Sequence, residues 1–294
     1  MLEIKKGTKA FGPNSVLREL DLTIPTGSIF GLVGINGAGK STLLRTIAGV
    51  YRLNDGEILF EGKNTYLDAN IRNEIAFVSD DLYFPTGSTI AGQRVFYENL
   101  YSFSKENYNR FLKMFELKEE MTISTLSKGN KRRVALLFAL SIQPKLLLLD
   151  EAYDGLEPLI RLKFKKVLAQ LVESEQLTVI ISSHSLKELE DICDSFGILE
   201  GGKLLRTGDL LDSRDDLNKY QLVFKHDFTA NDFKNFDVLH FEKEGHVYQL
   251  VIRGSKQEVQ EELNNLNPLL LDVLPVNFEE LFIYELESRG SLDE

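Results

Sequence analysis

Cysteine is nearly absent from this sequence, since Cys193 is the single one in 294 residues. One thiol cannot form an internal disulfide, and without clustered Cys or His residues it makes no zinc site. The composition therefore favours a reducing compartment.

Long hydrophobic runs are absent as well. The longest, at residues 134–142, falls well short of the roughly 18 residues that span a bilayer. Residues 1–12 lack the apolar run of a signal peptide, and no internal repeat or low-complexity tract is visible. We predict a cytoplasmic protein with no direct membrane insertion, which reaches a membrane only through a partner.

Basic residues are in deficit, with 34 Lys and Arg against 45 Asp and Glu and a net charge of −11. Such an excess of negative charge argues against a general affinity for nucleic acid or acidic membranes, so no nucleic-acid partner is expected. The acidity is uneven. Residues 1–214 contain 27 basic and 28 acidic side chains, whereas residues 215–294 contain 7 and 17. The argument against polyanions therefore applies mainly to the C-terminal part.

The sequence does contain a regular alternation of aliphatic runs and amphipathic helical patterns through its first two thirds. This alternation favours an α/β fold with a mainly parallel sheet. We expect buried strands at residues 28–33, 75–79, 145–149 and 178–182. Alternating patterns predict an antiparallel edge at residues 2–6, 20–24 and 56–60. Residues 82–126 predict a helical insertion, in which residues 83–115 contain nine aromatic side chains.

The C-terminal residues 213–294 show a second pattern, which predicts an acidic α+β domain after a domain of residues 1–212. We expect its elements at residues 220–225, 230–235, 238–242, 247–253, 256–266 and 269–276. Their order, β-α-β-β-α-β, is that of a small ferredoxin-like sandwich, and a last helix is expected at residues 278–286.

A glycine-rich loop carries the clearest chemical signal. It follows an apolar strand, opens a helix, and has two glycines separated by four residues before Lys and Ser, the pattern of a phosphate-binding loop (P-loop). Its backbone amides can hold a phosphate, Lys40 can reach the β- and γ-phosphates, and Ser41 can ligate Mg²⁺. The alternative is an ordinary strand-to-helix turn. The candidate ATP-binding residues of this loop are Gly34, Asn36, Gly37, Ala38, Gly39, Lys40, Ser41 and Thr42.

A run of four leucines ends in two carboxylates, Asp150 and Glu151. A buried strand that delivers Asp150 at its C-terminal end would place an oxygen ligand beside the magnesium ion. Glu151 would face differently and is the candidate base for an attacking water. By itself, the pattern also suits a buried strand that simply reaches the surface at two acids.

Residues 126–134, here called the signature segment, start a buried helix for which Ser127 is the expected N-cap. With the two preceding motifs, this segment resembles that of the nucleotide-binding subunits of ATP-binding cassette (ABC) transporters, which is usually Leu-Ser-Gly-Gly-Gln followed by basic residues. Lys128 replaces the first signature glycine and Asn130 the glutamine. The matching residues are Leu126, Ser127, Gly129, Arg133 and Val134.

The resemblance covers residues 1–212 and implies roles for four further side chains. Phe11 is similar to the aromatic that stacks on adenine, and His184 to the histidine that positions the γ-phosphate and the attacking water. Asp80 stands where the family usually has a glutamine that contacts Mg²⁺, which makes it a candidate metal ligand of altered length and charge. Glu157 stands where an aspartate is usual, in a loop that crosses the interface between two cassettes.

The resemblance also implies how the chain works. Two cassettes would pack head to tail, the second being another copy or a different subunit. ATP at the P-loop of one would be closed by residues of the other, namely Ser127, Lys128, Gly129 and Asn130. Glu151, His184 and Lys40 would carry the hydrolysis of ATP, with Mg²⁺ as cofactor.

Hydrolysis would energise a separate integral membrane permease, and export is the expected direction. Tyr83, Phe84 and Phe96 are candidates for docking that partner at the cytoplasmic face of the membrane, the alternative being that these rings fill the core of the insertion. Two other classes stay open. One is a soluble ABC ATPase outside transport, and the other is a regulatory nucleotide-dependent switch, which the replacements at Asp80, Lys128 and Glu157 keep possible.

Overall fold

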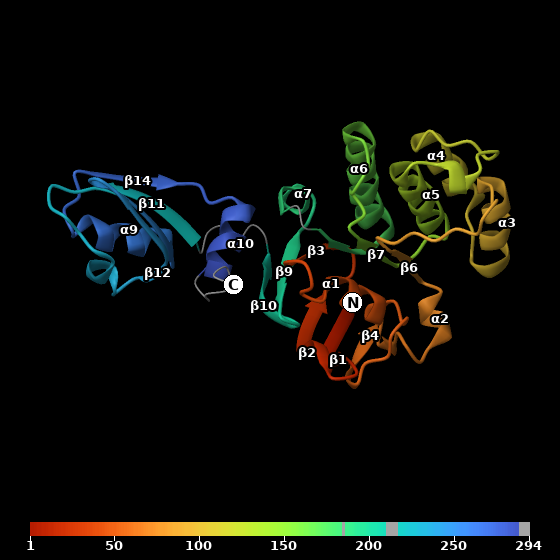
Figure 1. Cartoon of the computed structure of the whole chain (residues 1–294), viewed down its shortest axis with the longest axis horizontal. Coiled ribbons are helices and arrows are strands. Elements are labelled where there is room, and N and C mark those ends of the chain that lie inside the picture. Colours follow the sequence, from red (N-terminus) through yellow and green to blue (C-terminus); the bar gives the residue numbers. More distant parts are fainter. Residues whose placement is uncertain (184–185, 210–216, 288–294) are drawn as a thin grey trace. The chain divides into compact units, whose positions relative to one another are not determined.

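Figure 1 shows the computed structural model of the chain, which describes residues 1–183, 186–209 and 217–287. The chain divides into two compact units, Met1–Thr207 and Gly208–Glu294. The predicted domain boundary at residue 212 lies within residues 210–216, outside the described part, and stays a prediction.

A six-stranded sheet is the main sheet of the N-terminal unit, with the strand order β10-β9-β3-β8-β7-β6. The strands from β9 to β6 run parallel. Their bounds are Ile29–Val33 (β3), Ile75–Val78 (β6), Leu146–Asp150 (β7), Thr178–Ser182 (β8) and Ser195–Glu200 (β9), followed by Lys203–Asp209 (β10). All residues of β3, β7 and β8 are buried, which is why these segments are continuous apolar runs. The prediction of a mainly parallel sheet is confirmed.

A second, antiparallel sheet has the order β2-β1-β4-β5. Its strands are Leu2–Phe11 (β1), Asn14–Ile24 (β2), Asp55–Phe60 (β4) and Lys63–Asn64 (β5). β1 and β2 are longer than predicted because three register shifts between Ile4 and Ala10 interrupt the alternating pattern without ending the pairing. Helix α1 (Lys40–Ile47) places Leu43 and Leu44 in the same buried cluster as residues from both sheets, so the unit has one core around this helix.

Helices α3, α4 and α5 lie together at one end of the N-terminal unit (Figure 1). The helical elements are Ala69–Arg72 (α2), Ile90–Leu100 (α3), Lys105–Met114 (α4), Ile123–Thr125 (η1), Lys128–Ser141 (α5), Pro158–Glu175 (α6) and Leu186–Glu190 (α7). Tyr97 stacks on Phe138 with ring centroids 4.6 Å apart, and Tyr108 lies 6.1 Å from Phe138. Part of the aromatic excess in the insertion therefore forms its own core.

The C-terminal unit is a four-stranded sheet with the order β12-β13-β11-β14, antiparallel throughout. Its elements are Leu217–Val223 (β11), Ala230–Phe233 (η2), Asp237–Glu244 (β12), Val247–Arg253 (β13), Lys256–Asn264 (α9), Leu270–Leu274 (β14) and Phe278–Glu287 (α10). This order of strands is that of a ferredoxin-like fold. The short helix predicted at residues 230–235 is present as a four-residue 3₁₀ helix, Ala230–Phe233, and not as an α-helix. Asn231 and Asp232 are poor helix formers, and Asp232 bonds back to Thr229.

Candidate functional site

The P-loop connects β3 to α1, and its glycines are required for different reasons. Gly37 and Gly39 have φ values of +83° and +109°, in the left-handed region that favours glycine. Gly34 is limited by space instead, since a Cβ there would lie 2.4 Å from the carbonyl oxygen of Leu199. The loop is therefore a fixed backbone structure, and it ends at the N-terminus of a helix, where backbone amides point toward an anion.

Lys40 is the first residue of α1, and only 7% of it is exposed. Its ammonium donates hydrogen bonds to the carbonyl oxygens of Gly34 (2.7 Å) and Ile35 (3.3 Å), so the charge lies within the loop. Burial lowers the pKa of Lys40, and the nearby carboxylates of Glu151 and Asp150 partly oppose this shift. A phosphate group at the loop would supply the counter-charge that this buried amine otherwise has only in part.

Asp150 ends β7, and its side chain is completely buried. Its Oδ1 accepts hydrogen bonds from the hydroxyls of Ser41 (3.1 Å) and Ser182 (2.7 Å). Ser182 is opposite Asp150 in the register of the parallel strands β7 and β8. The structure thus brings together the two predicted metal-site residues Ser41 and Asp150, and adds Ser182, which sequence reasoning missed. The available signal was a hydroxyl at the end of the next buried strand.

The oxygens around Asp150 fit a magnesium ion. Its Oδ2 is buried and has no hydrogen-bond partner among the described residues, although such groups are usually paired. Among the residues that the structure describes, no group of three or more His, Cys, Asp or Glu side chains forms a metal site. A site with one carboxylate and one hydroxyl suits Mg²⁺, which takes its remaining ligands from water and substrate phosphates.

Glu151 has a φ of +49°, which is uncommon for a residue other than glycine. Its backbone amide donates to the carbonyl oxygen of Ser182 at 3.2 Å. The chain therefore turns sharply at the end of β7, and Glu151 leaves the strand while Asp150 stays in it. Strained backbone of this kind is concentrated at functional sites.

The signature segment begins α5. Ser127 is the N-cap, as its hydroxyl accepts a hydrogen bond from the amide of Asn130 at 3.2 Å. Ser127 and Lys128 are exposed, whereas Gly129 and Asn130 are half-buried. A Cβ on Gly129 would lie 2.2 Å from the carbonyl oxygen of Gly155, so this glycine permits close packing against the loop that follows β7.

Comparison with known proteins agrees with this geometry. The "ABC transporter" family model matches residues 17–154. The chain is 30% identical over 284 residues to the ABC transporter ATP-binding protein YtrB of Bacillus subtilis (strain 168), covering 96% of this chain and 97% of that protein. The chain belongs to the family of ABC transporter ATP-binding proteins.

Two further similarities extend this finding. The chain is 33% identical over 227 residues to the methionine import ATP-binding protein MetN of Protochlamydia amoebophila (strain UWE25), covering 71% of this chain and 67% of that protein. A solved structure of the ATP binding subunit of an ABC transporter superposes with a TM-score of 0.68 at 27% identity, covering 73% of this chain and 92% of that one. This chain is accordingly an ABC ATPase with the P-loop fold of the family.

Asp80 of this ABC ATPase is tied to α5. Its Oδ1 accepts a hydrogen bond from Arg132 at 2.8 Å and forms an ion pair with Lys128 at 3.5 Å. These contacts engage the carboxylate with the signature segment and not with Ser41 or Asp150. The pairing of Asp80 was not expected from the sequence, because Arg132 is 52 residues away along the chain.

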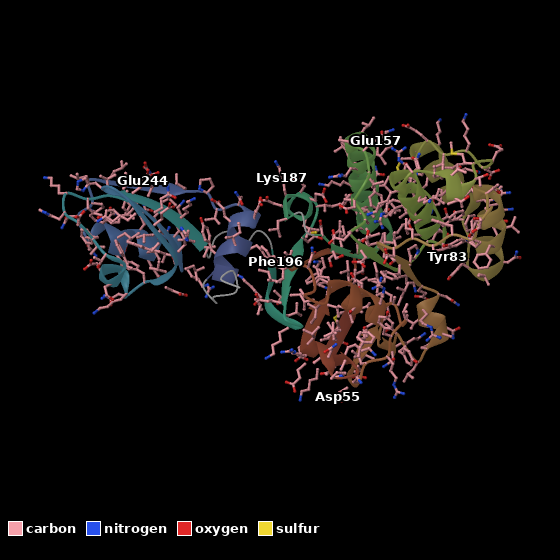
Figure 2. The ribbon with its side chains drawn as sticks, in the orientation of Figure 1. Asp55, Tyr83, Glu157, Lys187, Phe196 and Glu244 are labelled. Atoms are coloured by element: carbon pink, nitrogen blue, oxygen red, sulfur yellow. The ribbon has the colours of Figure 1, made fainter. Side chains whose placement is uncertain are left out.

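Glu157 precedes α6, where Figure 2 labels it, and its exposed carboxylate pairs with Arg133 of α5 at 2.8 Å.

Phe11 ends β1 with 43% of its surface exposed. Its ring lies T-shaped to that of Tyr51, with the ring centroids 5.2 Å apart, and the Lys9 ammonium lies 4.8 Å from the Phe11 centroid. His184 lies outside the described residues. Its predicted role and that of Phe11 stay predictions.

Proposed function

We propose that this ABC ATPase hydrolyses ATP as one half of a pair of cassettes and energises a separate membrane permease. The observation that carries the proposal is the arrangement around Asp150, in which a buried carboxylate, the Ser41 hydroxyl and the Lys40 ammonium converge on one loop. Such a site suits a magnesium nucleotide, because it combines a phosphate cradle with hard oxygen ligands.

Binding of ATP would begin at the P-loop. The glycine-rich backbone and the start of α1 hold the phosphates, and Lys40 moves its hydrogen bonds from the loop carbonyls to the β- and γ-phosphate oxygens. Ser41 and Asp150 would hold Mg²⁺, which when bound neutralises charge on the phosphate oxygens. Ser182 keeps Asp150 in position through its hydrogen bond to Oδ1.

Hydrolysis would follow by in-line attack of water on the γ-phosphorus. Glu151 accepts the proton of the attacking water, the bond from the γ-phosphorus to the bridging oxygen breaks, and ADP and phosphate are formed. Lys40 stabilises the negative charge that spreads over the phosphoryl oxygens. The turn at Glu151 supports this role, because it separates the base from the metal ligand Asp150.

A second cassette would complete the site. Ser127 and Lys128 lie exposed at the start of α5, so they are available to the nucleotide of a partner cassette. The amides at the start of this fourteen-residue helix would add to the binding of an anion.

The permease would dock on the helical insertion. Tyr83 and Phe96 expose 86% and 56% of their surfaces, and a hollow beside them is lined by Tyr83, Phe84, Tyr97 and Tyr101. Figure 2 places Tyr83 at the end of the unit that carries α3. Exposed aromatic rings beside a hollow are typical of protein interfaces. Among the described residues, no helix has both the length and the apolar character to cross a bilayer.

Turnover of ATP by the purified chain tests the enzymatic part of this proposal. We expect Glu151→Gln to bind ATP with unchanged affinity and to hydrolyse it very slowly. Glu173→Gln, which changes an exposed acid on α6, is the control that keeps the wild-type rate. Hydrolysis by Glu151→Gln at the wild-type rate would remove Glu151 from the role of base.

Direction of transport needs a separate measurement. We propose export, whereas uptake is the activity in the name of the related MetN protein. The chain and its co-purifying membrane subunit are reconstituted in liposomes with the ATPase outside. ATP-dependent accumulation of a substrate inside the liposomes indicates export, and ATP-dependent loss of a preloaded substrate indicates import.

A further inference from the structure

The two residues after β6, Ser79 and Asp80, contact helices on both sides. We call this pair the Ser79–Asp80 junction. The Ser79 hydroxyl accepts a hydrogen bond from Arg45 of α1 at 3.3 Å. The Ser79 carbonyl accepts one from Arg132 of α5 at 2.6 Å. The junction therefore joins the helix that starts at the P-loop to the helix that starts at the signature segment.

Charge makes the contact with α5 strong. The side chain of Arg132 is 0% exposed, and its guanidinium bonds to Asp80 Oδ1 at 2.8 Å. Lys128, which is 64% exposed, approaches the same oxygen at 3.5 Å. A buried guanidinium depends on its acceptors, because loss of one leaves a charge without compensation. The exposed Lys128 contributes less, since water screens its pair with Asp80.

The ionisation of Asp80 agrees with these contacts. Burial raises the pKa of this carboxyl, but the hydrogen bond from Arg132 and the positive charges of Lys128 and Arg132 outweigh burial and lower the pKa overall. Asp80 therefore carries its negative charge at neutral pH. A second acid, Glu157, pairs with Arg133 at 2.8 Å. Two ion pairs, from Asp80 to Arg132 and from Glu157 to Arg133, therefore hold the first turns of α5 in place.

We propose that Asp80 is a positioning residue, which sets the orientation of the signature segment relative to α1 through Arg132 and Lys128 and does not ligate magnesium. This inference rests on the proposed pairing of cassettes, because it gives the start of α5 its function there. Arg45 and Ser79 supply the other half of the connection, from α1 to the junction. Lys128 and Asp80, which both depart from the family pattern, thus form one ion pair with each other.

The substitution Asp80→Asn tests this role with little change in shape. The amide keeps an oxygen that can accept from Arg132 but removes the negative charge. We expect the affinity for ATP of a single chain and its dependence on Mg²⁺ to change by less than about twofold. The ATP concentration for half-maximal pairing of two chains should rise about tenfold, because Asp80→Asn weakens the contacts with Arg132 and with Lys128 together.

Pairing is measured by light scattering of the full chain in the Glu151→Gln background, so that hydrolysis does not reverse it. Binding to a single chain is measured at high dilution with a fluorescent ATP analogue and a titration of Mg²⁺. Asp80→Glu, which keeps the charge, should pair nearly as well as its parent. Asp81→Asn removes a charge from the exposed neighbouring position and serves as the matched control.

The outcomes separate this inference from the proposed function. If Glu151→Gln itself does not pair in ATP, both are wrong. If it pairs and Asp80→Asn pairs equally well, only the inference is wrong. A shifted Mg²⁺ dependence with unchanged pairing would instead make Asp80 a metal ligand.

A double-mutant cycle with Lys128→Met adds a second test. Because both variants break the same ion pair, the combined shift in pairing should be smaller than the product of the two single shifts. Independent, multiplicative shifts would overturn the role of Lys128 in the junction.

Discussion

Replacement of Gly129 by alanine perturbs the contact between the signature segment and the loop after β7. The added Cβ would lie 2.2 Å from the carbonyl oxygen of Gly155 and 3.2 Å from its carbon. Both atoms belong to the backbone, so no flexible side chain can move aside. Gly155 itself has a φ of +74°, which limits how its loop can adjust.

The size of the effect follows from overpacking. Forcing a methyl group into a closely packed contact costs about 1–3 kcal/mol. For a unit of roughly 200 residues, each kcal/mol lowers the melting temperature by about 2–4 °C. Gly129→Ala should therefore melt about 2–12 °C below the wild type. ATP hydrolysis should also fall, because the displaced loop follows Glu151.

Thermal unfolding of the full chain measures this shift. Gly92→Ala is a matched control, since Gly92 lies in α3 and its nearest atom to an added Cβ is 3.4 Å away. Alanine is the better helix former by about 0.5–1 kcal/mol, so this control should melt at or above the wild-type temperature. Wild-type melting of Gly129→Ala would refute the close approach of Gly129 to Gly155.

Three further predictions concern the same unit. Because burial lowers the pKa of Lys40 from 10.5, ATP binding just below pH 10.5 should be accompanied by uptake of a proton, as the phosphates restore the charge of the Lys40 ammonium. Calorimetry in buffers of different ionisation enthalpy should show a buffer-dependent heat of ATP binding for the wild type and not for Lys40→Met. Equal heats in all buffers would contradict this proton uptake. Ser182→Ala should raise the Mg²⁺ concentration for half-maximal hydrolysis, since it removes the hydrogen bond to the charged Asp150, and such a bond is worth about 1.5–3 kcal/mol. Ser174→Ala is the control, because the Ser174 hydroxyl donates only to the backbone of α6. An equal change of the Mg²⁺ concentration in the two variants would argue against a role for Ser182. A chain of residues 1–207 should fold and bind ATP, because each compact unit has its own buried cluster; an aggregated or unfolded product in circular dichroism would contradict this independence.

The sequence predicts the parallel sheet well because its strands are buried on both faces. β3, β7 and β8 therefore appear as continuous apolar runs with clear ends. The P-loop was equally predictable, since its function requires a fixed spacing of glycines, Lys40 and Ser41. In both cases the information is local in the chain.

The contacts that connect the site were not predictable from local patterns. Asp80 meets Arg132 across 52 residues, and Ser182 meets Asp150 across 32. Which side chains meet depends on the rotation of α5 and on the register of β7 against β8. A single sequence contains the residue types but not these pairings.

Local propensity also explains the one change of helix type in the C-terminal unit, at Ala230–Phe233. Residues 230–235 contain a helical pattern, but their Asn and Asp side chains form hydrogen bonds with the backbone that compete with those of an α-helix, so the segment forms one 3₁₀ turn.

In the N-terminal sheet, β1 continues past the point where the alternation of apolar and polar residues stops, because bulges keep its pairing with β2.

Pairing of the Glu151→Gln variant in MgATP is the most direct test of the proposed mechanism. The mass of the full-length variant is measured by light scattering with and without MgATP, with Lys40→Met in the same background as the control that lacks phosphate contacts. We predict twice the monomer mass in MgATP for Glu151→Gln and the monomer mass for the control. A Glu151→Gln chain that stays monomeric in saturating MgATP would contradict a site shared between two cassettes.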